Sequence, residues 1–397
     1  MKILIVNTLY KPYVLGGAEK ICEYMAYSLK DLGHDVSILT THKKNLYEEK
    51  EFLDGIKIIR LPIKNVYWHY YKRKPNPLKR FLWHFIDIYN PWMKKNLTEV
   101  LENDKYDIII SHNISGFSSC IWGVAKKLNI PVIQVLHDLY SICPNSNMFN
   151  GLKSCDNRCL KCSLFRFFHP FFSKDVDAVV GVSEYVLKKH LEYGLFKNAL
   201  IKTYIRNVLK VDFLPKVKLG KNKKEITFGY IGTLNKAKGV ELLLDVFSKI
   251  NIKNNILIAG KGYEKYESYM KDKYSKENIL FLGYQKSEEF FNKIDCLIVP
   301  SLCNDTFPTV ILESFINCIP VIASNMGGIP EIVNKYNGYI FNPDKKSELR
   351  DIILELVNNP YSLYQKRKKI METREEYADL KYWRNKYLEI IYKLKKS

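Results

Sequence analysis

The sequence predicts an α/β protein built from two doubly wound domains. Short apolar runs of strand length alternate with stretches of helical periodicity, and that alternation is typical of parallel βαβ units. The pattern breaks near residue 207 and restarts near residue 227. The length of 397 residues also exceeds that of one ordinary domain. We therefore expect ligands to bind at the carboxyl ends of the strands of two sheets.

The first half of the chain begins with an expected strand at residues 3–6, a Gly-Gly turn and a helix over residues 18–32 that Gly33 is placed to end. Four further strands are expected at residues 36–40, 108–111, 132–136 and 178–182. Helical stretches flank each of them. These elements predict an N-terminal Rossmann-like domain over residues 1–210.

A linker is expected at residues 212–225, which contain one proline, one glycine and five lysines. Strands then follow at residues 227–231, 255–259, 279–282, 296–299 and 321–323, with helices between them. They predict a C-terminal Rossmann-like domain over residues 211–375. Residues 376–397 form an amphipathic helix that we expect to pack back on the N-terminal domain.

The composition is strongly basic, with 62 Lys and Arg residues against 42 Asp and Glu residues and a net charge of +20. This balance indicates an anionic partner, which charge alone leaves open among nucleic acid, a phosphorylated small molecule and an anionic lipid surface. No apolar run approaches the roughly 18 residues that span a bilayer, and the N-terminus reads as a strand rather than a signal peptide. We expect a cytoplasmic protein with reduced cysteines; Cys22, Cys120, Cys296, Cys303 and Cys318 are expected in the core.

Glycine turns follow the first strand of each half. Gly16 and Gly17 open the first helix, where backbone N–H groups can approach an anion. Gly232 follows the first strand of the second half, and Lys238 stands just before a helix, where an ammonium can meet a phosphate. The alternatives are a plain tight turn and a solvated lysine.

The segment from Pro300 to Ser314 places an acid, Asp305, in a strand-to-helix loop and a second acid, Glu313, in the following helix. Pro308 suits the first helical turn, whose free N–H groups attract an anion. Two acids beside an anion-binding helix start can hold a sugar, a diphosphate and a ribose. A capping role is the alternative for Asp305. Glu313 lies among apolar residues, where a charged side chain without a function is rarely found.

In the order and spacing of these motifs, the sequence resembles the family 4 retaining glycosyltransferases, over nearly the whole chain. His137-Asp138 and the later Gly327-Gly328 pair fit the same pattern. The resemblance implies the GT-B fold, in which two Rossmann-like domains face a central cleft. It implies transfer of a hexose from a nucleotide-diphosphate sugar to a saccharide or lipid-linked acceptor in surface polysaccharide synthesis.

The resemblance also implies catalytic roles. Lys238 would contact the donor diphosphate, Asp305 the sugar hydroxyls and Glu313 the ribose, while His137 would lie under the donor sugar. No metal cofactor is expected for catalysis, because Lys238 and the helix start supply positive charge. The donor-binding set implied in this way is Gly16, Gly17, Gly232, Thr233, Lys238, Thr306, Phe307, Pro308, Thr309 and Glu313.

The sequence departs from the family pattern at several of these positions. Asp305 replaces the usual Glu, and Thr233 replaces the arginine that usually partners the lysine. The diphosphate therefore lacks one charge, which Lys236 or Lys261 is expected to supply. Pro308 and Cys318 replace glycines.

Residues 64–95 hold eight Lys or Arg, one acid and nine aromatic residues. This mixture suits an anionic membrane surface, although single-stranded nucleic acid and a packed helix with a solvated face are alternatives. We favour contact with the inner face of the cell membrane or a polyprenyl-linked acceptor, and a peripheral location there. Residues 164–172, rich in Phe, are either a second contact or a core helix.

Four cysteines, Cys143, Cys155, Cys159 and Cys162, end in a C-x-x-C pair. Four thiolates would form a closed structural zinc site, and free cytosolic thiols are the alternative.

The donor is expected to be UDP- or GDP-linked. An epimerase or a disaccharide synthase on the same fold is an alternative enzyme. A basic nucleic-acid-binding protein ranks last, because no nucleic-acid motif appears in the sequence.

Overall fold

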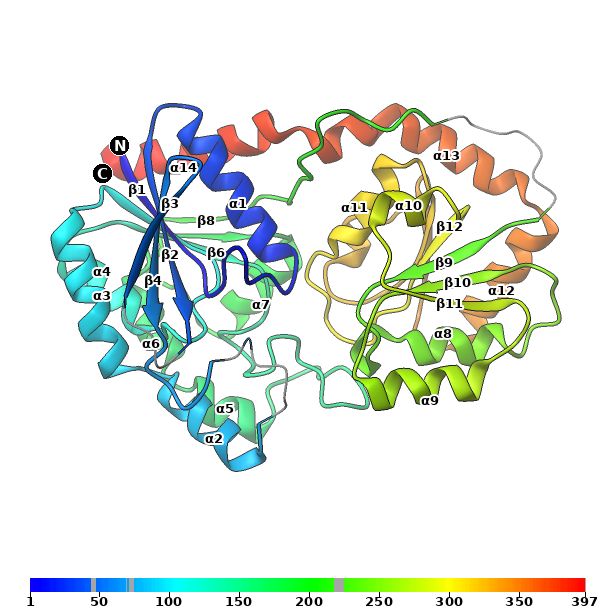
Figure 1. The fold of residues 1–397 in the computed structure, drawn as a ribbon, viewed down its shortest axis with the longest axis horizontal. Coiled ribbons are helices and arrows are strands. Elements are labelled where there is room, and N and C mark those ends of the chain that lie inside the picture. The colour runs from blue at the N-terminus through cyan, green and yellow to red at the C-terminus, as the bar shows by residue number, and fades with distance from the viewer. Residues whose placement is uncertain (44–47, 69, 71–74, 218–224, 397) are drawn as a thin grey trace. The chain divides into compact units, whose positions relative to one another are not determined.

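The computed structural model describes residues 1–43, 48–68, 70, 75–217 and 225–396, which divide into two compact units (Figure 1). The first unit comprises Met1–Met148, Asp156–Arg206 and Lys381–Ser397, and the second comprises Phe149–Cys155 and Asn207–Leu380. Each unit is a sheet of mainly parallel strands with helices around it, so the predicted α/β class is confirmed. The chain leaves the first unit twice, because residues 149–155 and 207–380 group with the second.

The first unit contains an eight-stranded sheet in the order β3-β4-β2-β1-β5-β6-β7-β8. All neighbours pair in parallel except β3 with β4. Strand order reverses between β1 and β5, since the chain builds outward from this pair in both directions. The strands are β1 (Lys2–Val6), β2 (Asp35–His42), β3 (Glu49–Leu53), β4 (Ile56–Pro62), β5 (Ile108–Ser111), β6 (Val132–Leu136), β7 (Ala178–Gly181) and β8 (Ile201–Tyr204).

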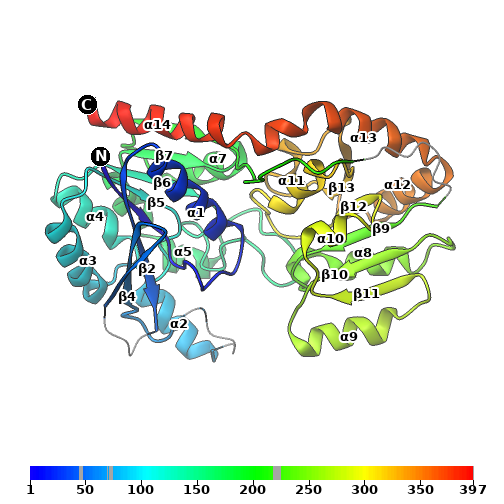
Figure 2. The same ribbon diagram turned by 45° about the horizontal axis from the view of Figure 1, so that its top comes forward.

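The helices of the first unit are α1 (Gly17–Lys30), α2 (Pro77–Ile86), α3 (Pro91–Asp104), α4 (Cys120–Lys127), α5 (Leu160–Arg166), α6 (His169–Phe172), α7 (Glu184–Glu192) and α14 (Leu380–Lys396). Figures 1 and 2 both show α14 lying along the other elements of the first unit, with which it is grouped. It buries Trp383, Tyr387 and Ile391, and the Lys395 ammonium lies 3.0 Å from the Asp107 carboxylate.

The second unit contains a six-stranded sheet in the order β11-β10-β9-β12-β13-β14. Every neighbouring pair is parallel, and the order reverses between β9 and β12. Its strands are β9 (Phe228–Ile231), β10 (Ile256–Ala259), β11 (Ile279–Gly283), β12 (Cys296–Val299), β13 (Val321–Ser324) and β14 (Gly338–Phe341).

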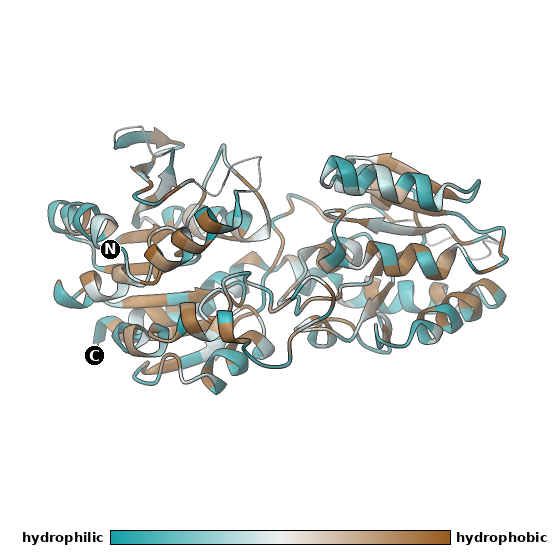
Figure 3. Cartoon of the chain, turned by 90° about the horizontal axis from the view of Figure 1, so that it is seen from below, coloured by the Kyte–Doolittle hydropathy of each residue, from teal (hydrophilic) through white to brown (hydrophobic). Residues whose placement is uncertain are grey.

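The helices of the second unit cover both faces of its sheet, and Figure 1 shows α8 and α9 on one side and α10 and α11 on the other. They are α8 (Val240–Phe247), α9 (Glu264–Tyr274), α10 (Ser287–Phe291), α11 (Thr309–Ile316), α12 (Lys346–Asn358) and α13 (Tyr361–Thr373). The helices carry both hydrophilic and hydrophobic stretches (Figure 3), as expected where one face packs on a sheet.

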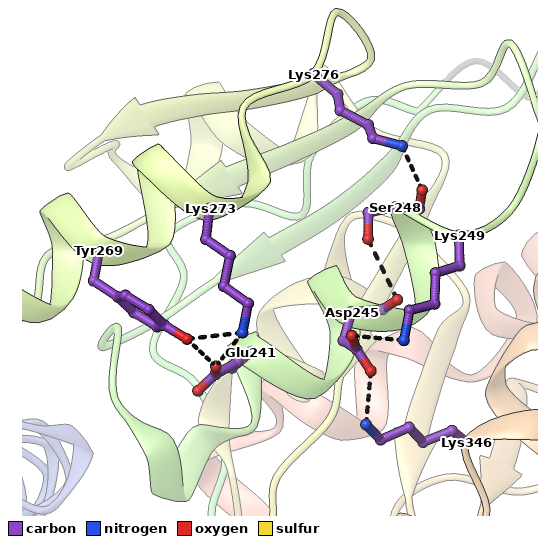
Figure 4. A network of polar contacts seen from close by, with 8 residues as sticks. All are labelled: Glu241, Asp245, Ser248, Lys249, Tyr269, Lys273, Lys276 and Lys346. Atoms are coloured by element: carbon purple, nitrogen blue, oxygen red, sulfur yellow. Dashed lines mark hydrogen bonds and ion pairs between the residues drawn. The ribbon is translucent and has the colours of Figure 1, made fainter.

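A polar network joins the outer surfaces of α8, α9 and α12 (Figure 4). Glu241 accepts hydrogen bonds from Tyr269 at 2.9 Å and Lys273 at 3.1 Å. Asp245 pairs with Lys249 at 2.9 Å and Lys346 at 2.6 Å. The lysines are largely exposed, so these ion pairs add little to stability and mainly fix the mutual positions of the three helices.

The five cysteines expected in the core are buried, which confirms that prediction. Residues 218–224 of the expected linker lie outside the described residues. Within the described part of the chain, no helix combines the length and the apolar character that crossing a bilayer would require.

Candidate active site

The strand order of the second sheet reverses between β9 and β12, and the loops after these two strands carry the predicted donor residues. Lys238 ends a short 3₁₀ turn, Lys236–Lys238, that follows β9. Asp305 lies in the loop between β12 and α11. Ligands of doubly wound sheets bind at such a reversal, outside the carboxyl ends of the strands. The fold therefore brings Lys238 and Asp305 to the position where a ligand is expected.

Lys238 and Asp305 form an ion pair in which the ammonium lies 2.5 Å from the carboxylate Oδ2. The Ser301 hydroxyl donates to the same oxygen at 3.1 Å. Burial lowers the pKa of Lys238, but the Asp305 carboxylate and the Cys303 thiol raise it by more, so the net pKa lies above its usual value. The lysine is thus held as a cation beside a carboxylate that is 11% exposed.

The loops after β9 and β12 are tied directly to each other. The amides of Leu302 and Cys303 both donate to the Ala237 carbonyl, at 2.8 and 3.1 Å. Gly239 has a φ of +70°, and a Cβ there would stand 1.8 Å from the Pro300 carbonyl oxygen. A glycine is required at this position, both for its backbone angle and for the close approach of the two loops.

A glycine pair after β13 supports the backbone of Asp305. The Gly328 amide donates to the Asp305 carbonyl at 2.8 Å. Gly327 has a φ of +60°, and a Cβ on it would lie 2.2 Å from that same oxygen. The sequence showed the Gly327-Gly328 pair as a motif but gave it no role; in the structure it positions the loop that carries Asp305.

Glu313 lies one turn into α11 and is half-buried. Its Oε2 accepts a hydrogen bond from the Ser287 hydroxyl of α10 at 2.7 Å. Sequence reasoning missed Ser287, since a lone serine at the start of a helix is a common capping residue and carries no signal of its own. Thr306, Phe307 and Pro308 are buried before the helix, and Thr309 begins it.

Gly232 and Thr233 occupy the loop that follows β9. A Cβ on Gly260 would lie 1.8 Å from the Gly232 carbonyl oxygen, so the loops after β9 and β10 also meet closely. The Leu234 amide donates to the Lys261 carbonyl at 2.9 Å. Thr233 is exposed, and its carbonyl accepts from the Tyr230 hydroxyl at 2.9 Å. Lys261, expected to supply the missing charge, therefore belongs to the neighbouring loop.

The first unit has its own reversal of strand order, between β1 and β5, and two histidines stand nearby. His137 follows β6 and His112 follows β5. Their rings are stacked at 16° with centroids 5.0 Å apart, and Nδ1 of His112 lies 2.7 Å from Nε2 of His137. Burial lowers the pKa of His137 to about 4 and that of His112 well below its usual value. Both rings are therefore neutral near pH 7, and one nitrogen of the pair donates while the other accepts.

His112 is a residue that sequence reasoning missed, although a signal existed. It follows β5 directly, just as His137 follows β6, and the carboxyl ends of neighbouring parallel strands meet at one edge of a sheet. Gly16 and Gly17 open α1 after β1. The Gly16 amide donates to the Glu19 side chain at 2.9 Å, so the start of this helix is capped by its own carboxylate.

Family models match both halves of the chain. Residues 15–202 match the model described as Glycosyltransferase Family 4, and residues 214–376 match that described as Glycosyl transferases group 1. A Klebsiella pneumoniae protein named as an uncharacterized 42.6 kDa protein in the cps region is 32% identical, over 84% of this chain and 87% of its own. The chain is a family 4-like glycosyltransferase. An uncharacterized glycosyltransferase of Methanocaldococcus jannaschii is 29% identical, over 96% of this chain and 95% of its own.

The fold of this glycosyltransferase is GT-B. The structure of Anabaena HepE in complex with UDP matches 99% of this chain and 100% of its own, with a TM-score of 0.71 at 17% identity. The predicted GT-B fold, and the prediction that the chain is an enzyme, are therefore confirmed. The assignment of individual site residues stays a prediction.

The cysteine cluster of the glycosyltransferase contains thiol–thiol contacts. The Cys159 and Cys162 sulfurs are 3.5 Å apart. A hydrogen bond with Cys162 lowers the pKa of Cys143 to about 6 and raises that of Cys162. Cys155 groups with the second unit. Among the described residues no three His, Cys, Asp or Glu side chains are arranged to hold a metal ion. Structural zinc at these cysteines stays a prediction.

Proposed function

We propose that this glycosyltransferase moves a hexose from a nucleotide-diphosphate sugar to a saccharide or lipid-linked acceptor, with retention of the anomeric configuration. The observation that carries the proposal is the ion pair of Lys238 and Asp305 at the strand reversal of the second unit. A half-buried cation beside a carboxylate suits a ligand that presents both a phosphate and sugar hydroxyls.

The leaving group of the reaction is a nucleoside diphosphate, on which negative charge develops as the glycosidic bond breaks. Lys238 and the free N–H groups at the start of α11 would stabilise that charge. Asp305 would then exchange part of its contact with Lys238 for hydroxyls of the sugar. Glu313, oriented by Ser287, would accept hydrogen bonds from the ribose hydroxyls.

His137 would act on the sugar as a neutral group. Because burial lowers its pKa to about 4, the ring carries no charge that would repel the cation-like sugar of the transition state. Retention is supported by the resemblance to the retaining family, and it is the part of the proposal that stereochemistry tests directly.

UDP is the preferred nucleotide of the donor. This preference is supported by the HepE structures, which are complexes with UDP and with UDP-glucose. GDP stays the alternative. The Klebsiella relative from the cps region supports a role in surface polysaccharide synthesis, at the inner face of the cell membrane.

The test is to incubate the protein with UDP- and GDP-sugars and lipid or saccharide acceptors and to determine the product linkage by NMR. We expect sugar transfer with the configuration of the donor kept, and no transfer by Glu313→Ala. An inverted product would overturn retention. Conversion of a UDP-sugar without an acceptor would favour an epimerase, and transfer by Glu313→Ala at the wild-type rate would overturn the site.

A further inference from the structure

The outward faces of α2, α5 and α6 and the first turn of α3, all in the first unit, carry large exposed apolar side chains. Large hydrophobic side chains normally point inward, and those that lie on the surface of a monomer are usually scattered singly. Here they are concentrated on neighbouring helices. The exposed members of this group are Leu78, Phe81, Leu82, Phe85, Trp92, Leu160, Leu164, Phe167, Phe168 and Phe171. We call this set the apolar face.

Ring contacts show that the two segments of the apolar face, about 80 residues apart in sequence, form one surface. Phe81 of α2 packs against Phe165 of α5 with ring centroids 5.2 Å apart. Phe172 of α6 contacts Phe168 at 6.4 Å and stacks on Tyr89 at 5.0 Å. The helices α2 and α5 accordingly lie side by side in Figure 1.

Not all aromatic residues of the segment 64–95 face outward. Trp68 and Trp83 are only 4% and 3% exposed and pack into a small core cluster with Leu9 and Ile63. Residues 69 and 71–74 lie outside the described residues. The Phe-rich stretch 164–172, for which a core helix was the alternative, instead exposes most of its aromatic rings.

Basic side chains border the apolar face. Lys79, Arg80, Lys94, Lys95, Lys161 and Lys174 are exposed. Between Pro75 and Lys95 the sequence has one acid, Asp87, which is fully buried and bonded to the Tyr140 hydroxyl and the Gly116 amide. Between Cys159 and Lys174 it has none. Within these two stretches the exposed charge is therefore positive.

We propose that the apolar face inserts into the surface of an anionic lipid bilayer, which deepens the proposed function by naming the residues that hold the enzyme beside a lipid-linked acceptor. An apolar helical face with a basic border is the pattern of helices that lie in a membrane interface, and lysines there gain from anionic headgroups. A second copy of the chain fits less well. A two-fold interface would bring the same positive border against itself.

Insertion can be followed through Trp92, which lies in the first turn of α3, three residues after the Tyr89 ring that stacks on Phe172 of α6. Trp92 is 61% exposed, whereas the other four tryptophans, Trp68, Trp83, Trp122 and Trp383, are at most 4% exposed. Vesicles of phosphatidylglycerol and phosphatidylcholine that carry a bromine-labelled acyl chain should therefore quench mainly Trp92. We expect quenching and a blue shift with these vesicles, and loss of the quenching in Trp92→Phe.

Two substitutions separate insertion from electrostatic adsorption. Phe85→Asp and Phe171→Asp should each lower vesicle partitioning about tenfold or more, at both low and high salt. Leu200→Asp, on an equally exposed apolar residue of the same unit (70%), should leave partitioning unchanged. Lys79→Glu should weaken binding at low salt and much less at high salt.

Equal partitioning of Phe85→Asp, Phe171→Asp and wild type would overturn insertion. So would a wild-type dimer in sedimentation that the same substitutions dissociate, because the face would then be an interface between copies. Nucleotide binding and donor turnover with a soluble acceptor, measured on the same variants, report on the proposed function separately. We expect both to be kept in the apolar-face variants.

Discussion

The ammonium of Lys238 lies 2.5 Å from the carboxylate of Asp305, although 67 residues separate the two in sequence. They meet because β9 and β12 are neighbours in the sheet and the chain turns back between them. Without a bound ligand, each group satisfies the charge of the other. When the diphosphate of a donor binds Lys238, Asp305 loses its partner and needs hydrogen bonds from the sugar hydroxyls of the same donor. Recognition of the phosphate is in this way linked to recognition of the sugar.

Lys238→Ala should reduce UDP affinity and transfer rate by a factor of about ten to a hundred, since it removes a charge-assisted contact and leaves the buried Asp305 unpaired. Calorimetric titration with UDP measures this loss. Lys249→Ala removes an equally positive side chain that pairs with Asp245 at the surface, and it should bind UDP as the wild type does. Equal affinities for both variants would argue against a phosphate contact at Lys238.

Gly327→Ala should lower both stability and activity. The added Cβ would stand 2.2 Å from the Asp305 carbonyl oxygen, so the loop must move. Gly283→Ala is the matched control because Gly283 has a similar φ of +66° but nothing within 4 Å of the new Cβ. We expect both variants to lose roughly 1 kcal/mol of stability, because alanine is strained at a positive φ, and we expect only Gly327→Ala to lose transfer. Thermal denaturation and transfer assays measure the two effects.

His112→Phe should lower kcat about tenfold with little change in the donor KM, because it keeps the stacked ring but removes the hydrogen bond that orients His137. His112 is a positioning residue in this account. A merely structural role would instead lower the melting temperature and leave the kcat of the folded fraction unchanged. His190→Gln, on a buried histidine of α7, should leave kcat at the wild-type value.

His190 also predicts part of the pH dependence of stability. Burial lowers its pKa to about 4, while the usual value is 6.5. Above pH 6.5 the ring is neutral in both the folded and the unfolded chain. As the pH falls from 6.5 to 4, the unfolded chain takes up a proton that the folded protein excludes, so the free energy of unfolding decreases. This residue contributes about 3 kcal/mol to that decrease.

The measurement is urea denaturation of wild type and His190→Gln at pH 7 and at pH 4. From pH 7 to pH 4, the free energy of unfolding should fall by about 3 kcal/mol less in His190→Gln than in the wild type. An identical pH dependence in both proteins would contradict a depressed pKa at His190.

Much of the fold could be predicted, because buried parallel strands are continuous apolar runs. The strands that were missed carry charge or lie at an edge. Glu49–Leu53 of β3 begins Glu-Lys-Glu and pairs antiparallel at the edge of the sheet. Ile201–Tyr204 of β8 is half-exposed at the opposite edge, where one side of the strand has no partner to require apolar residues.

The site was predictable only in part. Lys238 and Asp305 stand in motifs of fixed spacing, so the sequence could name them. Ser287 meets Glu313, and His112 meets His137, through one side chain each. Which residues meet in this way depends on the order of the strands in the sheet and not on the spacing of residues in the sequence. The apolar face required the structure for the same reason. Helical periodicity cannot say which of two apolar faces of α2 packs inward.

The most direct test of the central claim is a thermal-shift titration of wild type and Glu313→Ala with UDP, GDP and ADP. A ligand that binds the native state raises its stability by RT ln(1 + [L]/Kd). We predict that UDP raises the melting temperature of the wild type well above GDP and ADP, and that Glu313→Ala melts normally without ligand but loses most of the UDP shift. No shift with any nucleotide, or an equal shift in Glu313→Ala, would contradict the account.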